Sequence, residues 1–227
     1  MTRLASWALM MCVPPLLLLI AIRLVMTPAF LQIEYQRPGF PADPYGMTTD
    51  QRLEYGPKVL DYLVANQPLR VLTELTLANS GVLFTVPELG HLRDVQQVAQ
   101  VGFLALWIIG GVAVVCTVIV ARRAGRRSIA HALRLGAWLT IGLIAAIALT
   151  AVLAWDTFFT VFHQLFFQGG TWIFAYSDSL IRLFPEQFWF DAAITVGALT
   201  VGGAVLFLVA AWRLDRGTLT RAGADRL

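Results

Sequence analysis

The sequence predicts an all-α integral membrane protein with four transmembrane helices and a small extracytoplasmic cap. Three observations support this prediction: an apolar composition, four apolar stretches of membrane-spanning length and an uneven distribution of basic residues. The 227-residue chain is 58% hydrophobic and only 14% charged, which is too apolar for an ordinary soluble domain. We therefore expect residues 1–227 to form a single membrane domain.

Four stretches have about the 20 apolar residues that a helix needs to cross a bilayer. They run approximately over residues 7–26, 101–121, 135–155 and 192–212. The first is longer than the apolar region of a signal peptide and lacks a small-x-small cleavage site, so we interpret it as a retained helix. Pro14 and Pro15 predict a kink within it.

Basic residues predict the orientation of these helices. Residues 122–134 contain five arginines and no acidic residue, which is typical of a cytoplasmic loop. With both termini, this side would carry 10 basic and two acidic residues, leaving 7 basic and 12 acidic residues for the opposite side. We expect both termini in the cytoplasm, and we attribute the net charge of +3 to topology and not to nucleic-acid binding.

The cysteines and the paired glycines fit a packing role. Cys12 and Cys116 fall within apolar stretches, where a disulfide of an outer domain is not expected. The glycine pairs at 110–111 and 202–203 predict close contacts between helices. The chain has no CxxC pair, P-loop or GxSxG elbow, so the sequence lacks the common nucleotide and nucleophile motifs.

Residues 27–97 are too long for an irregular connection and are expected to form the extracytoplasmic cap. Thr48 and Gln51 predict a capping box that begins one or two short amphipathic helices, interrupted at Gly56 and Pro57. Residues 81–86 predict a brief β segment. Thr85 and Glu88 then predict a second capping box, for a helix that continues into the second span.

Residues 156–190 are expected to form a second extracytoplasmic segment, which is rich in aromatic residues. Aromatic side chains are common where a protein meets the membrane surface. Their density here exceeds what anchoring requires. We therefore expect part of this segment to form an amphipathic layer that faces acyl chains.

The chain has three histidines, and two are predicted to lie on the same side of the membrane. His131 belongs to the arginine-rich segment and is expected to be solvated. His91 lies about ten residues before the second span and His163 about eight after the third, roughly 10–15 Å beyond the hydrocarbon if both helices continue. A chain that turns soon after the third span would instead place His163 at the headgroup boundary.

Each of these two histidines has a carboxylate nearby in the sequence. His91 and Asp94 are spaced i,i+3, and Asp156 and His163 are spaced i,i+7, so each pair shares a face of a regular helix. A carboxylate can fix the tautomer of an imidazole and favour its charged form, both in a catalytic base and in a structural pair. Spacing alone is compatible with either role.

Two histidine motifs resemble the bacterial lipoprotein intramolecular transacylase family. They lie in "FTVPELGHLRDVQQV", with an H-[ML]-x-D-V pattern from His91 to Val95, and in "FHQLFFQGGTW", with an F-H-x-x-F-F pattern from Phe162 to Phe167. Leu92 stands where we expect methionine in the family. Other matching residues follow in the expected places: Trp172, Asp178, Pro185 and Trp189.

The resemblance implies a four-helix enzyme of the bacterial cytoplasmic membrane with its active site at the extracytoplasmic face. Such enzymes move the sn-2 acyl chain of a diacylglyceryl lipoprotein to the α-amine of its N-terminal cysteine, giving the N-acyl lyso form. The implied partners are lipoproteins and membrane lipid, and no cofactor is implied. Two histidines near neutrality can share the proton transfers of such an ester aminolysis.

We predict His163 as the principal base and His91 as its acid or oxyanion partner, although the opposite assignment fits the same pattern. The expected supporting residues are Asp94, Asp156, Arg182 and Asp178. The residues expected to line the acyl site are Phe159, Phe162, Phe166, Phe167 and Trp172.

Two alternatives remain open from the sequence. A metal-dependent membrane hydrolase could use His91, His163 and Asp94, but the chain has no HExxH motif and no third outer histidine to complete a typical zinc set. A non-catalytic scaffold or sensor would use the two histidines as structural or pH-responsive groups.

Overall fold

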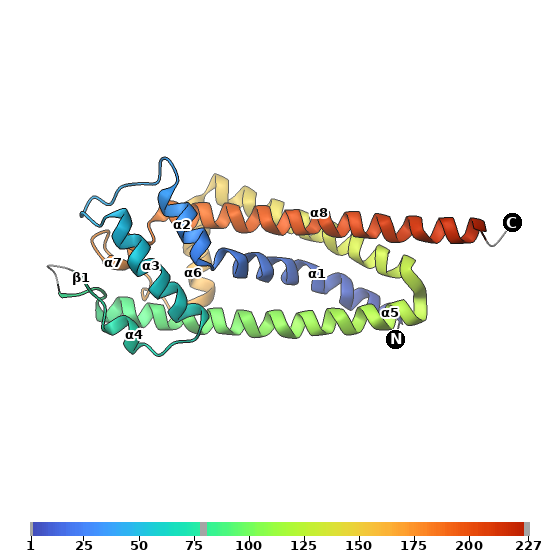
Figure 1. Ribbon diagram of the computed structural model, residues 1–227, viewed down its shortest axis with the longest axis horizontal. Coiled ribbons are helices and arrows are strands. Elements are labelled where there is room, and N and C mark those ends of the chain that lie inside the picture. The colour runs from blue at the N-terminus through green and yellow to red at the C-terminus, as the bar shows by residue number, and fades with distance from the viewer. Residues whose placement is uncertain (1, 78–80, 225–227) are drawn as a thin grey trace. The chain divides into compact units, whose positions relative to one another are not determined.

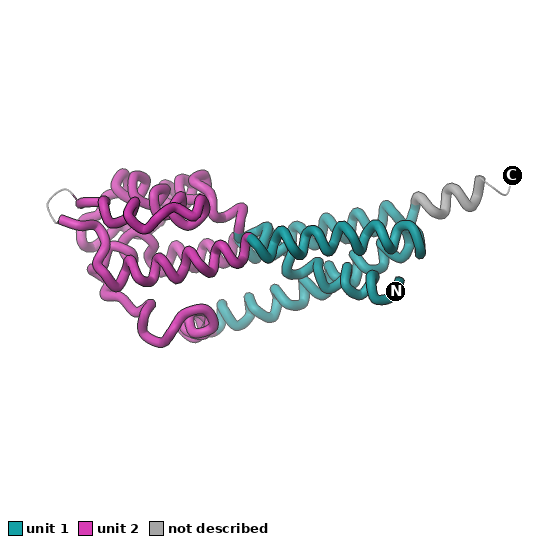
Figure 2. The backbone as a smooth tube through the Cα atoms, turned by 90° about the horizontal axis from the view of Figure 1, so that it is seen from below, with its two compact units in different colours: residues 1–22, 104–153, 196–227 teal, residues 23–103, 154–195 magenta. Residues whose placement is uncertain are grey.

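The computed structural model describes residues 2–77 and 81–224, and it is predominantly helical (Figure 1). The chain divides into two compact units, coloured separately in Figure 2. Unit 1 contains residues 1–22, 104–153 and 196–227, and unit 2 contains residues 23–103 and 154–195. The two segments predicted to lie outside the membrane, 27–97 and 156–190, both fall in unit 2.

Unit 1 is built from long apolar helices. Helices α1 (Thr2–Val25), α5 (Val86–Leu153) and α8 (Glu186–Ala224) are the three helices in the described chain that are long and apolar enough to cross a membrane. Only 11% to 28% of the most apolar stretch of each is buried by the protein itself. Apolar surface that the protein leaves uncovered is suited to contact with lipid.

The second and third predicted spans both lie in α5. This 68-residue element is interrupted at Gly125, whose φ of 76° and ψ of 177° are not helical. The backbone reverses direction along this helix, as its green and yellow parts show in Figure 1. The arginine-rich segment 122–134 is therefore helical on both sides of Gly125 and is not an extended loop.

Close packing in unit 1 depends on two glycines. A Cβ atom on Gly136 would lie 2.7 Å from Val13, and a Cβ atom on Gly203 would lie 2.8 Å from Leu17. The prediction of close packing at the pair 202–203 is thus met at Gly203, whereas a Cβ atom on Gly111 or Gly202 would meet nothing within 4 Å. Helix α1 continues through Pro14 and Pro15.

Unit 2 consists of several short elements, most of which pack around one hydrophobic core, whereas the helix at residues 155–166 has no buried residue. These elements are α2 (Pro28–Gln36), α3 (Thr49–Val64), α4 (Arg70–Thr73), β1 (Thr76–Leu77), β2 (Gly81–Val82), the start of α5, α6 (Trp155–Phe166), α7 (Ser179–Leu183) and the start of α8. Strands β1 and β2 pair antiparallel, so the predicted β segment is confirmed but is limited to two residues.

The capping box of Thr48 and Gln51 is confirmed at the start of α3, with side-chain to backbone bonds of 2.8 and 3.2 Å. The expected interruption at Gly56 and Pro57 is absent, because α3 runs through both residues. A Cβ atom on Gly56 would lie 3.1 Å from the ring of Tyr35, so glycine permits α2 to approach closely. Burial of one face of α3 in the core outweighs the local helix-breaking tendency of the pair.

Helix α7 is the point where the elements of unit 2 meet. Three elements bond to its backbone: Tyr35 Oη of α2 donates to the Leu183 carbonyl (3.0 Å), Arg52 Nε of α3 donates to the Arg182 carbonyl (3.0 Å), and the Leu180 N–H donates to Glu88 Oε1 of α5 (2.7 Å). Because α7 follows the aromatic segment 167–178, these bonds fix one end of that segment.

Candidate active site

His91 lies near the start of α5, and its position is set by the helix beginning before it. One of the two bonds of the predicted Thr85–Glu88 capping box is present, with Glu88 Oε2 accepting from the Thr85 N–H (2.6 Å). The Thr85 hydroxyl donates to the same oxygen (2.8 Å). The predicted continuation of this helix into the second apolar stretch is also confirmed. His91 lies one turn after Glu88. The two carboxylate oxygens of Glu88 bind Thr85 and the Leu180 N–H, and these bonds hold this part of the helix in place.

His163 lies in the last turn of α6. Ala154, with a φ of −152° and a ψ of 65°, separates α6 from α5, so α6 is not a continuation of the third predicted span. The depth estimated for His163 from an unbroken helix therefore does not apply. The chain instead turns at the end of that span, which was the alternative expectation for His163.

The tautomer of His163 follows from one hydrogen bond. Its Nδ1 atom lies 2.8 Å from the carbonyl oxygen of Phe159, one helical turn earlier. Since a carbonyl only accepts, Nδ1 of the neutral ring must carry the hydrogen and Nε2 retains the basic lone pair. Burial lowers the pKa of His163, while the bond to Phe159 opposes that shift.

The two histidines come together in unit 2. Their ring centroids are 6.2 Å apart and their planes differ by 24°, which is a stacked arrangement. His91 is buried, with 7% of its surface exposed. Its burial, together with the nearby His163, lowers the pKa of His91 to about 4, and Asp94 acts in the opposite direction. Both imidazoles are therefore neutral at pH 7, the form in which an imidazole can accept a proton.

Aromatic rings surround the pair. Phe159 and Trp172 lie against His163 with centroid distances of 4.1 and 4.8 Å, and Phe167 lies 4.8 Å from His91. Phe162 is 5.5 Å from His163, and Phe162 and Phe166 are 5.1 Å apart. Phe162 and Phe166 remain 46% and 49% exposed, so they extend the aromatic surface outward from the histidines.

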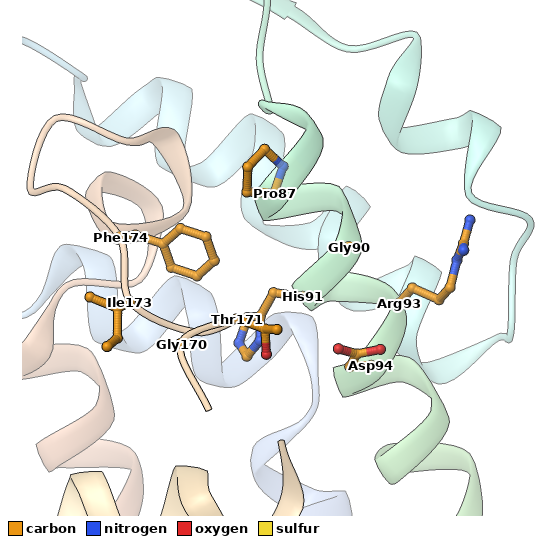
Figure 3. A pocket seen from close by; sticks show the side chains of 9 residues that line it. All are labelled: Pro87, Gly90, His91, Arg93, Asp94, Gly170, Thr171, Ile173 and Phe174. Carbon is orange, nitrogen blue, oxygen red and sulfur yellow. The ribbon is translucent and has the colours of Figure 1, made fainter. Parts of the chain in front are cut away.

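A cavity of about 310 Å³ opens beside His91. It lies between the first turns of α5 and the segment 170–174, as Figure 3 shows. Its lining residues are Pro87, Gly90, His91, Arg93, Asp94, Gly170, Thr171, Ile173 and Phe174. Asp94 thus shares a cavity with His91, as the i,i+3 spacing predicts.

The other predicted supporting residues are placed differently. Asp156 is exposed in the first turn of α6, about 10 Å along the helix from His163. The tautomer of His163 is instead set by the Phe159 carbonyl, which is one turn away and not two. Asp178 Oδ2 accepts from the Ala175 N–H (2.9 Å) and so shapes the turn before α7.

Arg182 does not form the ion pair with Asp178 that their i,i+4 spacing allows. It binds Asp43, with 3.0 Å between Nε and Oδ2, and it donates to the Tyr45 carbonyl. Its side chain is 12% exposed and that of Asp43 only 2%. The partner of Arg182 lies far away in the sequence, and no local spacing indicates it.

Several residues at the site were not among those predicted from the sequence, and three of them have side chains that bear on its chemistry or its structure. Arg93 and Phe174 line the cavity, and Phe174 also lies 5.5 Å from His91. Glu88 is fully buried and joins α5 to α7. The predicted capping box indicated a structural role for Glu88, but no sequence pattern indicated its bond to Leu180.

Two polar atoms at this site have no hydrogen-bond partner. Among the described residues, His91 Nδ1 and Trp172 Nε1 are the buried side-chain nitrogen or oxygen atoms without one. Both belong to the aromatic cluster around His163. Across the same part of the chain, no three His, Cys, Asp or Glu side chains gather in a group that could hold a metal ion.

Long apolar helices, together with a buried and a half-buried histidine among aromatic rings, define a membrane-integral helical protein with a site suited to proton transfer. The family model for lipoprotein intramolecular transacylase Lit matches residues 7–189. The chain belongs to the lipoprotein intramolecular transacylase family, and it is accordingly an acyltransferase of the membrane.

Individual proteins are similar along most of the chain. An uncharacterized protein of Aquifex aeolicus (strain VF5) is 25% identical over 208 residues, which cover 92% of this chain and 93% of that protein. The membrane-integral lipoprotein intramolecular transacylase Lit from Bacillus cereus has a similar fold, with a TM-score of 0.82 and 20% identity over 97% of this chain and 98% of that one. A variant of it with one histidine replaced by arginine gives a TM-score of 0.74 and 19% identity, over 97% and 95% of the chains.

Proposed function

We propose that His163 and His91 catalyse the transfer of the sn-2 acyl chain of a diacylglyceryl lipoprotein to the α-amine of its N-terminal cysteine. The product is the N-acyl lyso form. Family membership supports the reaction, and the approach of the two imidazoles to 6.2 Å is the observation that supports their roles.

His163 acts as the base. The α-amine has an ordinary pKa of about 7.7 to 8 and must be deprotonated before it attacks the ester carbonyl. As the C–N bond forms, Nε2 of His163 accepts a proton from that nitrogen. The Phe159 carbonyl supports this role, because it holds the hydrogen on Nδ1 and also stabilises the imidazolium that forms.

His91 acts as the partner on the leaving oxygen or on the oxyanion. When the tetrahedral intermediate collapses, the ester C–O bond breaks and the glyceryl oxygen gains the proton that the amine lost. His91 is suited to assist because its unpaired Nδ1 is buried in the same cluster. Asp94, in the cavity beside His91, orients the ring and opposes the effect of burial on the pKa of His91.

The reaction needs no acyl-enzyme. The ester and the amine belong to one substrate, so a site that holds them together gives a high effective concentration, which can supply several kcal/mol of the barrier reduction. The aromatic residues support that role by lining the acyl chains: Phe159, Phe162, Phe166, Phe167 and Trp172. Arg182, Asp178 and Asp156 act through the structure of the segments that carry them.

We further propose that the chain crosses the membrane four times, with both termini in the cytoplasm and unit 2 as the extracytoplasmic cap. The kink at Gly125 supports this count, because it divides α5 into two apolar arms. A cysteine introduced at the exposed Asp50 in a variant without Cys12 and Cys116 tests it. The cysteine should react with an impermeant reagent in intact cells, and labelling only after the membrane is opened would contradict the orientation.

Mass spectrometry tests the reaction itself. Purified protein is incubated with a synthetic diacylated lipopeptide, and fragmentation of the product locates the acyl chain. We expect the mass to stay constant while one acyl chain moves from the glyceryl group to the N-terminal nitrogen. Release of free fatty acid, or an unchanged substrate with folded protein, would contradict the proposal.

A further inference from the structure

Trp172 carries a donor that the folded chain does not use. Its indole N–H can donate a hydrogen bond but cannot accept one. The nitrogen is buried without a partner among the described residues. Leaving such a group unpaired costs about 1–3 kcal/mol, so native proteins rarely do so without a functional reason.

The position of this donor connects it with the proposed chemistry. The indole ring lies 4.8 Å from the His163 ring at an angle of 34°, so it partly covers the proposed base. On either side of Trp172 in the sequence, residues Gly170, Thr171, Ile173 and Phe174 line the cavity next to His91 (Figure 3). The segment that carries Trp172 therefore borders both His163 and the cavity that His91 lines, although the Trp172 side chain is not itself among the lining residues.

The segment is held in place at several points. Ile173 N–H donates to the Gly170 carbonyl, and Gly170 adopts a φ of 87°, a conformation suited to glycine. Beyond it, α7 is fixed by the bond from Leu180 to Glu88. A donor on an anchored segment keeps its direction during a reaction, which is the property that an oxyanion-stabilising group needs.

The other groups at the site leave this role open. In ester aminolysis the carbonyl oxygen becomes negatively charged and needs a hydrogen-bond donor. The Nδ1 hydrogen of His163 is already used by Phe159, and its Nε2 must accept the proton of the amine. Among the fully buried side-chain nitrogen and oxygen atoms of the described residues, those without a partner are Nε1 of Trp172 and Nδ1 of His91. The first is always a donor, and the second can serve the leaving oxygen.

We propose that the indole N–H of Trp172 donates a hydrogen bond to the oxyanion of the tetrahedral intermediate, which makes Trp172 a third catalytic residue. This inference rests on the proposed function. As the C–N bond forms, the π electrons of the carbonyl move to oxygen and are stabilised by this bond. As the C–O bond breaks, they return, and the indole keeps its hydrogen throughout.

The decisive variants replace the indole with an aromatic ring that has no N–H. Trp172→Phe does so with a smaller ring, and incorporation of 3-benzothienylalanine at position 172 does so with an almost isosteric one. We expect kcat on the diacylated lipopeptide to fall by about 10²-fold, the usual loss of one oxyanion donor, with a much smaller change in KM. The unfolding temperature should stay unchanged or rise, because a buried unsatisfied donor has been removed.

Trp155→Phe is the matched control. Trp155 packs against Phe158, Phe159 and Phe190 on α6 and α8. The kcat of the Trp155→Phe variant should remain near that of the native enzyme. The pH dependence of kcat separates a donor from a group that only positions His163. A donor variant should keep the native pH profile, whereas a shifted profile would show that the indole acts through the imidazole.

The outcomes distinguish this inference from the proposed function. No N-acyl product from the native enzyme would overturn the proposed function and this inference with it. An active native enzyme whose two position-172 variants keep full kcat would overturn the inference alone. A loss of kcat that follows a drop in unfolding temperature, or a shifted pH profile, would also overturn it, because the indole would then be structural or positioning.

Discussion

The buried threonines of unit 1 and the buried Arg52 and Glu88 of unit 2 satisfy their polar groups in different ways. In unit 1, Thr140 and Thr200 are buried, and each hydroxyl donates to the carbonyl four residues earlier in its own helix. In unit 2, the buried Arg52 and Glu88 bond to the backbone of α7, more than 90 residues later in the sequence. The two buried threonines of unit 1 thus bond within their own helices, whereas the buried Arg52 and Glu88 of unit 2 join distant elements. Unit 1 also has a long-range polar pair, Arg134 with Asp215, but both of its side chains are partly exposed.

This difference reflects what each unit must do. A helix in lipid has to satisfy its polar groups within itself, because no water is available to replace a missing partner. A site that brings two histidines together needs side chains that hold separate segments in register. The contrast predicts that substitutions in unit 2 have effects on activity and stability that equivalent substitutions in unit 1 do not have.

The largest expected effect is at the two histidines. His163→Ala and His91→Ala should each lower the rate of acyl transfer by about 10²-fold or more, the usual loss on removing a positioned acid or base. Mass spectrometry of the lipopeptide product measures the rate. His131→Ala, in unit 1, should leave it nearly unchanged.

The double variant sharpens this test. If both imidazoles act on one transition state, His91→Ala combined with His163→Ala should be little slower than the slower single variant, since groups that act as a unit are not additive. Full activity in either single variant would contradict the histidine mechanism even if the reaction itself were confirmed.

The next effect concerns the buried carboxylate of Glu88. Glu88→Ala leaves the N–H groups of Thr85 and Leu180 without an acceptor, so we expect a loss of about 2 kcal/mol in stability and a slower reaction. Thr140→Val is the matched change in unit 1, and it should cost less than about 1 kcal/mol because the helix still satisfies the Gly136 carbonyl.

Unfolding temperatures measured in one detergent decide between these expectations. Glu88→Gln keeps an acceptor oxygen and should recover part of the loss. Equal destabilisation by the Glu88→Ala and Thr140→Val changes would contradict the expectation that long-range polar bonds contribute more to stability than local ones.

A smaller effect is expected from acid. The pKa of His91 is lowered to about 4 in the folded protein from an ordinary value of 6.5, so between these values the unfolded chain binds more protons. Stability should therefore be greatest above about pH 6.5 and fall as the pH decreases toward 4. His91→Gln should reduce this slope in thermal unfolding, and an unchanged slope would show that other groups cause it.

The smallest effect is expected at the cysteines. Cys12 and Cys116 are free thiols of unit 1, and packing is the role that we assign to them. Replacing both with alanine should leave acyl transfer largely intact, because the proposed route forms no acyl-enzyme. Intact-protein mass spectrometry during turnover provides the complementary measurement, and a covalent acyl adduct would contradict the route.

The elements that depend on local contacts could be predicted from the amino-acid sequence alone. Apolar stretches identified the helices α1, α5 and α8, because membrane-spanning length leaves a continuous signal. Thr48 and Gln51 marked the start of α3, since a capping box involves residues only three apart. The spacing of His91 and Asp94 likewise predicted that they lie on one helical face, and in the structure both line the same cavity.

Contacts between residues that are distant in the sequence could not be predicted in this way. The local spacing suggested that Arg182 pairs with Asp178 and that His163 pairs with Asp156. In the structure, Arg182 forms an ion pair with Asp43. The Phe159 carbonyl, and not Asp156, binds the His163 ring. The non-helical backbone at Ala154 also separates α6 from α5, and no local sequence pattern predicted this break. The physical reason is that a periodic pattern records contacts within one element, whereas the partner of a buried charge or an unpaired N–H depends on how all the elements pack together.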